Sequence, residues 1–202
     1  MPDYTLAITG ASGSLCGLRL LRELATHPDV DRVNVIASRG ARKVAQVELS
    51  LDGEGLTAFR QAFTPEGAGA RVRWLEEEDL AAPTASGSHP NAGMAIVPCS
   101  TATLASIACG TSRNLIHRSA EVALKERRRL VLGIRESPYS LVHIENMRQA
   151  TLAGAVIAPI SPMFYNHPAA IGDVVEQYVG RVLDLLGLEH RVGRRWKSDI
   201  QD

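Results

Sequence analysis

Small hydroxyl residues follow most of the short apolar segments of this chain and are its clearest candidate binding residues. Four of the five segments that resemble buried strands are followed by serine or threonine beside the start of an expected helix, among them Ser12, Ser38, Ser100 and Thr103. Free N–H groups and the helix dipole at such positions favour a phosphate group. A single serine there is more often an ordinary N-cap. Several in one crevice favour a phosphorylated ligand.

The first of these turns, ITGASGSLCG, resembles a dinucleotide-binding loop but lacks its spacing. Its glycines are Gly10, Gly13 and Gly17, and Ser12 stands where the fingerprint needs its second glycine. Where an NAD-binding protein places an acidic residue for the ribose, the second segment ends in Ser38 and Arg39. A mononucleotide therefore fits this loop better than NAD.

Charged residues mark two further places along the chain. Arg135 and Glu136 end an apolar segment where a ligand crevice is expected, which favours a binding site over a buried ion pair. Arg118 and Lys125 share a helical stripe that continues to the cluster 127–129. Without other information, such a stripe is a solvated helix face whose cations offset the helix dipole.

The elements that must position these residues alternate regularly. Apolar segments at 4–9, 32–38, 94–100, 129–136 and 154–160 predict buried strands, and helical periodicity predicts helices at 15–27, 39–48, 102–109, 112–127, 140–153 and 171–186. This βαβα order predicts an α/β fold with a doubly wound, mostly parallel sheet and helices on both faces. Ligands of such sheets bind beyond the carboxyl ends of the strands.

Two regions depart from this alternation. Residues 50–92 are rich in Gly, Ala, Ser and Pro, and they predict a helix within 54–63, a possible strand at 71–75 and then a functional loop. We expect residues 1–188 to form one domain and 189–202 a polar tail that docks over the ligand crevice through Trp196.

Composition narrows the class of protein. The 202 residues carry 22 basic and 22 acidic side chains, so nothing points to nucleic acid or an anionic membrane. Cys16, Cys99 and Cys109 have no spacing typical of disulfides or zinc, and the histidines form no metal-like cluster. We expect a reduced, cytoplasmic protein with no leader, membrane span or bound metal.

Several motifs together resemble one known family. The segments GASG, PCSTATL, LIHRSAEVALKERRRLVL, RESPYSLVHIENM, GAVIAPISPMFY and VVEQYVGRVLDLLG occur in the order and spacing of the flavin prenyltransferases, the UbiX-like flavoproteins. The likeness covers about residues 4–188. It implies a Rossmann-like, FMN-binding enzyme that transfers a dimethylallyl group to N5 and C6 of reduced FMN without a metal. The product would serve a decarboxylase of the UbiD type, and the family typically forms homododecamers with active sites at subunit junctions.

The resemblance also implies roles for individual residues. The FMN contacts would be Gly10, Ala11, Ser12, Ser38, Ser100, Thr103 and Arg135. Contacts with the phosphate of dimethylallyl phosphate or diphosphate would be Arg118, Lys125, Glu136, Tyr165 and Arg181. Ser12, Lys125 and Glu136 would take part in catalysis, and Trp196 would add an apolar wall. Departures from the family pattern at Cys16, Leu80, Arg129 and Asn166 leave the preferred prenyl donor open.

Three other functions compete with this interpretation. An FMN-dependent cysteine decarboxylase shares the wider fold but has no need of Lys125, Glu136 and Arg181 as a phosphate clamp. Direct decarboxylation of aromatic acids is an older assignment for this family, and we attribute that activity to the partner enzyme. A non-catalytic flavin carrier would likewise not need the clamp.

Overall fold

A six-stranded parallel sheet organises the chain, which we describe from a computed structural model covering residues 1–51 and 55–195. The strand order is β3-β2-β1-β4-β5-β6, so the chain winds outward from β1 in one direction and from β4 in the other. The strands are β1 Tyr4–Ile8, β2 Val33–Ala37, β3 Val72–Leu75, β4 Gly93–Cys99, β5 Arg129–Ile134 and β6 Val156–Ile157. The predicted doubly wound α/β architecture is confirmed.

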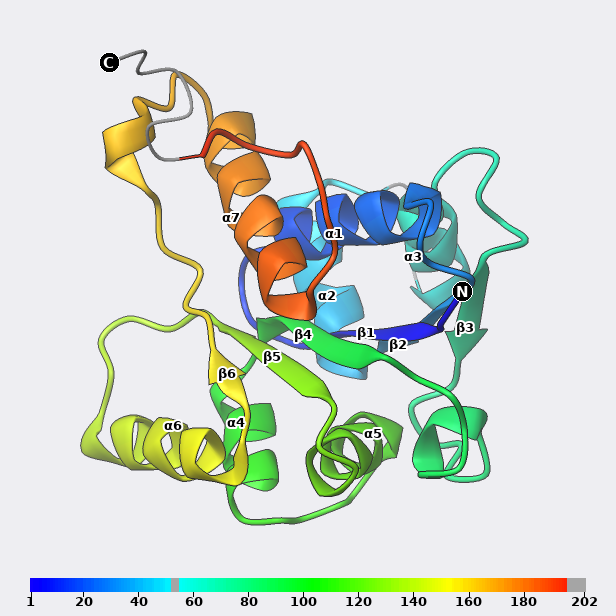
Figure 1. The fold of residues 1–202 in the computed structure, drawn as a ribbon. Coiled ribbons are helices and arrows are strands. Elements are labelled where there is room, and N and C mark those ends of the chain that lie inside the picture. The colour runs from blue at the N-terminus through cyan, green and yellow to red at the C-terminus, as the bar shows by residue number, and fades with distance from the viewer. Residues whose placement is uncertain (52–54, 196–202) are drawn as a thin grey trace.

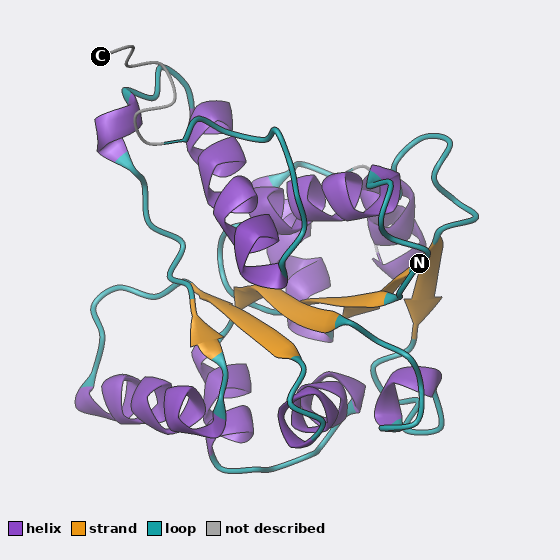
Figure 2. Ribbon diagram, viewed as in Figure 1, coloured by secondary structure: helices purple, strands orange, loops and turns teal. Residues whose placement is uncertain are grey.

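Helices cover both faces of the sheet (Figures 1 and 2). One face packs against α1 Ser14–Thr26, α2 Arg39–Glu48, α3 Gly55–Phe63 and α7 Ile171–Leu186; the other packs against α4 Thr101–Ala108, α5 Leu115–Lys125 and α6 Leu141–Ala153. Alternate side chains of β4 serve the two layers, since Val97 joins the first core and Ile96 the second. Such two-sided burial explains why the strands are almost continuously apolar.

The ends of the central strands are joined by Thr9. Its hydroxyl donates to the Pro98 carbonyl at 2.9 Å and accepts the Ser100 N–H at 2.7 Å. This buried side chain therefore fixes the loop after β1 against the loop after β4. The point where the winding direction reverses lies between these two strands, and ligands of doubly wound sheets bind there.

The structure refines several expected boundaries. The segment 154–160 pairs as a strand only over Val156–Ile157, although the Ala158 and Ile160 N–H groups still donate to β5 carbonyls at 2.9 Å. The helix expected at 112–127 spans Leu115–Lys125, since Asn114 caps it and Arg127 adopts a left-handed φ of 57°. The possible strand at 71–75 is the edge strand β3, and short 3₁₀ helices occur at Pro83–Ala85 and Phe164–Asn166.

The basic cluster 127–129 is not a solvated helix face, so this prediction from the sequence is wrong. Arg128 donates to the carbonyls of Gly87 and His89 at 2.6 and 3.0 Å, which ties the loop before β4 to the start of β5. Arg129 donates to the Leu186 carbonyl at 2.7 Å and so caps the end of α7. Within residues 1–51 and 55–195, no helix has the length and apolarity needed to cross a membrane.

Candidate functional site

A row of candidate residues lies along the carboxyl edge of the sheet. Ile8 pairs with Ala37 across β1 and β2, and Cys99 pairs with Ile134 across β4 and β5. The residues that follow these pairs therefore emerge at one edge on neighbouring strands, about 5 Å apart. They include the predicted FMN contacts Gly10, Ala11, Ser12, Ser38, Ser100, Thr103 and Arg135.

The loop after β1 is built for close backbone approach. A Cβ atom on Gly10 would lie 3.2 Å from the backbone of Gly40, which brings the start of α2 against this loop. Gly13 has a left-handed φ of 114° at the N-cap of α1, a conformation that favours glycine. Ser12 lies between the two glycines and is partly exposed at this edge.

Glu48 is a site residue that the sequence did not reveal. From the end of α2, its carboxylate accepts the Ser14 N–H at 2.8 Å and the Gly13 N–H at 3.1 Å. Burial alone would raise the pKa of Glu48, but hydrogen bonds from the Ser12 side chain and from Ser14 and Gly13 hold that pKa below its ordinary value. No local motif marks Glu48, because its partners lie about 35 residues earlier in the chain.

The cap from Glu48 gives a prediction for stability. The folded-state pKa is lowered, so the contribution of the carboxylate is complete above the unfolded-state pKa and is lost as the pH falls through the folded-state pKa. Glu48→Ala should lower the free energy of unfolding at pH 7 by about 1 kcal/mol, a value that allows for solvent screening. Denaturant unfolding should show the difference from wild type shrinking below about pH 4. A difference that stays constant down to pH 3 would contradict this role.

The N-terminus of α4 and the end of β5 together suit an anionic group. The Ser100 hydroxyl accepts the Thr103 N–H at 3.3 Å and donates to the Thr103 hydroxyl at 3.0 Å, so the Thr103 O–H can still donate to a ligand. Arg135 lies next to Ser100 across the sheet, and its Nε is buried without a hydrogen-bond partner in the described part of the chain. Buried guanidinium nitrogens are normally satisfied. This set of donors therefore fits the phosphate of FMN.

The N-termini of α1 and α2 receive carboxylates from the chain itself. Glu48 serves α1, and the Glu77 carboxylate accepts the Arg39 N–H of α2 at 2.8 Å. Ser38 caps α2 by accepting the Ala41 N–H at 3.0 Å, and its hydroxyl can still donate one hydrogen bond. In the described residues, no carboxylate caps α4 in this way. The α4 terminus is thus the better place for a ligand phosphate.

Glu136 follows Arg135 at the same edge and is half-buried. Its carboxylate accepts the Ser137 N–H at 2.9 Å, which orients the side chain beside the loop to α6. The next helix begins with a capping box in which Ser140 and His143 bond each other's backbone N–H groups. His143 therefore serves as part of the N-terminal cap of α6.

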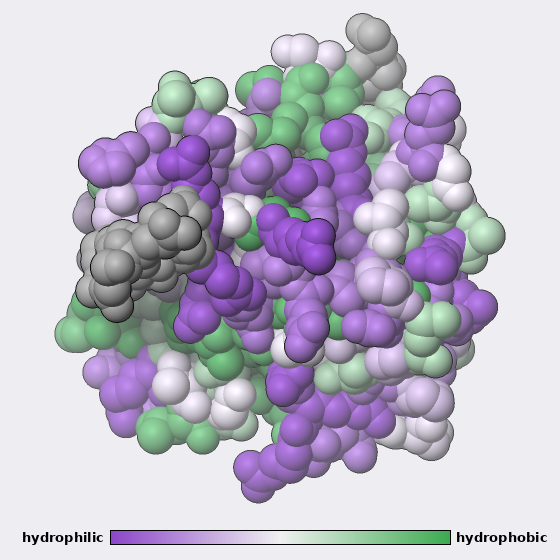
Figure 3. All heavy atoms as spheres, turned by 45° about the horizontal axis from the view of Figure 1, so that its top comes forward, coloured by the Kyte–Doolittle hydropathy of each residue, from purple (hydrophilic) through white to green (hydrophobic). Residues whose placement is uncertain are grey.

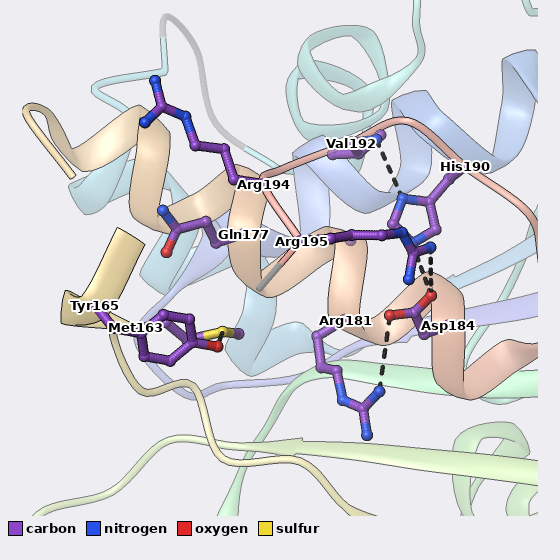
Figure 4. Close-up of a pocket in the computed structure, with 10 residues that line it drawn as sticks. Met163, Tyr165, Gln177, Arg181, Asp184, His190, Val192, Arg194 and Arg195 are labelled. Carbon is purple, nitrogen blue, oxygen red and sulfur yellow. Dashed lines mark hydrogen bonds and ion pairs between the residues drawn. The ribbon is translucent and has the colours of Figure 1, made fainter. Parts of the chain in front are cut away.

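Tyr165 and Arg181 meet at a second place, a cavity of about 430 Å³ between α7, the segment after β6 and the tail (Figure 4). The segment that carries Tyr165 leaves the sheet edge beside the first loop, since a Cβ on Gly13 would lie 3.1 Å from Ile160. Arg181 forms an ion pair with Asp184 at 3.7 Å and remains 59% exposed. The structure thus brings together Tyr165 and Arg181, two of the predicted contacts with the phosphate of the prenyl donor.

Arg118 and Lys125 do not line this cavity. Lys125 ends α5 and precedes β5, whereas Arg135 follows β5, so the two flank opposite ends of a strand about 20 Å long. Lys125 pairs with its neighbour Glu126, and Arg118 donates to the Ala85 carbonyl and to Glu121 at 3.0 and 3.1 Å. One protomer alone does not place Lys125 beside Arg135 and Glu136.

Two other expectations concern the tail and metals. The tail runs along α7, and four of its residues line the same cavity as Tyr165 and Arg181, namely His190, Val192, Arg194 and Arg195. Trp196 lies outside the described residues. Within residues 1–51 and 55–195, no group of three or more His, Cys, Asp or Glu side chains is arranged to hold a metal ion.

Comparison with known proteins shows the family to which the chain belongs. The family model described as Flavoprotein matches residues 2–183. The chain therefore belongs to the flavoprotein family.

Closer relatives specify the branch of that family. The chain is 43% identical over 201 residues to a protein of Aquifex aeolicus named flavin prenyltransferase UbiX, covering 98% of this chain and 100% of the relative. It also resembles the structure of AnUbiX (PadA1) in complex with FMN and dimethylallyl pyrophosphate, with a TM-score of 0.86, 38% identity and 98% coverage of both chains. A dodecameric FMN-dependent UbiX-like decarboxylase from Escherichia coli O157:H7 gives a TM-score of 0.85 at 36% identity, covering 97% of this chain and 100% of that one. The chain is thus a member of the flavin prenyltransferase family.

Proposed function

We propose that this protein transfers a dimethylallyl group from dimethylallyl phosphate or diphosphate to N5 and C6 of reduced FMN. The observation that carries the proposal is the combination of two groups of side chains that suit an anion, one at the carboxyl edge of the sheet and one in the cavity beside α7. Ser100, Thr103 and Arg135 suit the phosphate of FMN, and the cavity with Tyr165 and Arg181 suits the phosphate of the donor. An enzyme that acts on a cysteine substrate would not need the second place.

The proposed reaction needs no oxidant or metal to balance. The allylic C–O bond of the donor breaks, and its electron pair leaves with the phosphate. Reduced FMN supplies N5 and C6, each of which exchanges a hydrogen for a bond to the five-carbon group. One displaced hydrogen is taken up by the prenyl chain and the other leaves with the phosphate, so the flavin gains C₅H₈. Arg181 and the Tyr165 hydroxyl would stabilise the departing phosphate by charge and hydrogen bonding.

Ser12 and Glu136 are the proposed participants at the flavin. Ser12 lies in the loop after β1, where it would face N5, and Glu136 would carry a proton between substrate and phosphate. Trp196 would complete the apolar wall around the prenyl group.

Replacing Ser12 tests its part in this scheme. Ser12→Ala should lower the rate constant for prenyl transfer by about tenfold, because the variant loses one hydrogen bond to a group that carries or develops charge. The melting temperature should change little, because Ser12 is partly exposed and Glu48 keeps its bonds from Gly13 and Ser14 when the Ser12 hydroxyl is removed. Single-turnover kinetics and thermal unfolding measure the two effects. A variant that loses stability but keeps the wild-type rate would make Ser12 a purely structural residue.

Assembly into a homododecamer, as in the structure from Escherichia coli, would complete the site. Helix α6 buries only Ala150 among its own residues and leaves Leu141 and Leu152 72% and 69% exposed, as suits a contact with a second copy. On the face shown in Figure 3, apolar side chains form separate patches among hydrophilic ones. A neighbouring protomer would then supply Arg118 and Lys125 to the donor phosphate.

The product would be released to a decarboxylase of the UbiD type in the cytoplasm. An apo-decarboxylase incubated anaerobically with this protein, reduced FMN and dimethylallyl phosphate should become active. Omitting the donor is the control, and it should leave the decarboxylase inactive. A decarboxylase that is activated equally without the donor would mean that this protein delivers only FMN, as a carrier would.

A further inference from the structure

Gln177 places a buried amide in the wall of the cavity that Tyr165 and Arg181 line. It lies four residues before Arg181 on α7, so the two side chains share one face of that helix. The residue is only 8% exposed, and its Oε1 is buried without a hydrogen-bond partner among the described residues. Buried amide oxygens normally have a partner, so this oxygen can accept a hydrogen bond from a ligand.

The tail covers Gln177 where it crosses α7. A Cβ atom on Gly193 would lie 3.0 Å from the Gln177 Cα, so the backbone of the tail passes directly over this residue. Gln177 also borders a second cavity, of about 350 Å³. In Figure 4, however, its amide projects on the side of Met163 and Tyr165, which line the first cavity and not the second. The unpartnered oxygen therefore belongs to the cavity of the proposed prenyl donor.

The proposed reaction gives the leaving phosphate a hydrogen that the intact donor lacks. A phosphate monoester loses its second proton at about pH 6, so at neutral pH the donor is mostly a dianion whose oxygens only accept hydrogen bonds. When the allylic C–O bond breaks, the phosphate keeps the electron pair, takes up the hydrogen displaced from the flavin and becomes hydrogen phosphate. Its P–O–H group is a donor, which is what the Gln177 oxygen lacks.

We propose that Gln177 accepts a hydrogen bond from the phosphate leaving group once that group has taken up its proton. The inference rests on the proposed prenyl transfer and adds to it a residue that contacts the departing group. Because the contact forms with the protonated leaving group and not with the dianionic donor, it favours bond cleavage over donor binding. Arg181 contributes charge in both states, whereas Gln177 responds to the proton.

The experiment compares wild type, Gln177→Met and the control Gln61→Met. Methionine has nearly the length of glutamine but only a weak acceptor, and Gln61 is an exposed residue of α3 outside this cavity. Anaerobic single turnovers with reduced FMN and increasing dimethylallyl phosphate give the rate constant of flavin enlargement by C₅H₈ and the apparent Kd of the donor. Calorimetry of the FMN-loaded proteins compares inorganic phosphate with sulfate, at a pH where both are dianions and only phosphate carries a proton.

Gln177→Met should lower the rate constant by about tenfold, the effect of one lost hydrogen bond to a charged group, and should change the donor Kd by less than about threefold. Its affinity for inorganic phosphate should fall by about tenfold, while its affinity for sulfate stays within about twofold of wild type. The melting temperature should not fall, because the variant removes a buried acceptor that has no partner. Gln61→Met should match wild type in every measurement.

A wild-type rate constant in Gln177→Met, or equal losses of affinity for phosphate and sulfate, would overturn the role of Gln177. If methionine prevents folding, Gln177→Asn, which shortens the reach of the amide, should show the same difference between the two anions. If wild type enlarges no flavin, the proposed transfer fails. A preference for phosphate over sulfate that depends on Gln177 would then still support the acceptor, and equal binding of the two anions by wild type would contradict it.

Discussion

Glu136→Gln should lower the rate constant for prenyl transfer by about 10²- to 10⁴-fold, the usual contribution of a positioned acid or base. The amide can still accept the Ser137 N–H, so the loop after β5 should keep its shape. FMN affinity should therefore remain within about twofold, well below the cost of one lost hydrogen bond. Single-turnover formation of prenylated flavin and fluorescence titration of FMN measure the two quantities.

Glu145→Gln provides the control for this prediction. Glu145 lies on the exposed side of α6 and pairs only with Arg148 among the described contacts, at 2.9 Å. Its replacement should leave the rate unchanged. A Glu136→Gln variant that turns over at the wild-type rate would remove Glu136 from the proposed proton transfer.

Two impaired variants should regain activity when they are mixed, if protomers share sites. Lys125→Ala and Arg181→Ala should each lower kcat/KM by about 10- to 100-fold, because each removes a charged contact with the donor phosphate. When the two variants are dissociated, mixed equally and reassembled, random assortment gives about a quarter of the sites both native side chains. Activity should therefore rise to about that fraction of wild type, as measured by flavin enlargement.

The pair Lys125→Ala and Arg118→Ala tests the same idea in reverse. Both residues lie on α5, so any one neighbour supplies both to a site. Mixing these two variants should restore nothing. Recovery in this control, or none in the first mixture, would contradict the proposed sharing between protomers.

The sequence predicted which residues lie at the carboxyl edge of the sheet, because their positions follow from strand pairing. Ser100 and Arg135 each follow a buried strand, and parallel pairing of Cys99 with Ile134 places them side by side. Apolar runs and helical periodicity are local signals, so the sequence alone predicts the order of the elements and the edge of the sheet where a ligand binds.

The residues that were missed or misjudged depend on contacts between distant segments. Glu48 reaches back to Gly13, and Arg129 caps a helix that ends 57 residues later. Neither partner is marked by local spacing. Lys125 shows a different limit, because its family motif implies a shared site while the protomer places it at the opposite end of β5 from Arg135.

The mass of the flavin after one anaerobic turnover tests the central claim most directly. Protein, reduced FMN and dimethylallyl phosphate or diphosphate are combined without oxygen, and the extracted flavin and the released phosphate or diphosphate are quantified together. The account predicts a flavin heavier by one C₅H₈ unit, with one leaving group released per flavin enlarged. Unaltered FMN recovered from folded, FMN-loaded protein with both donors would contradict it.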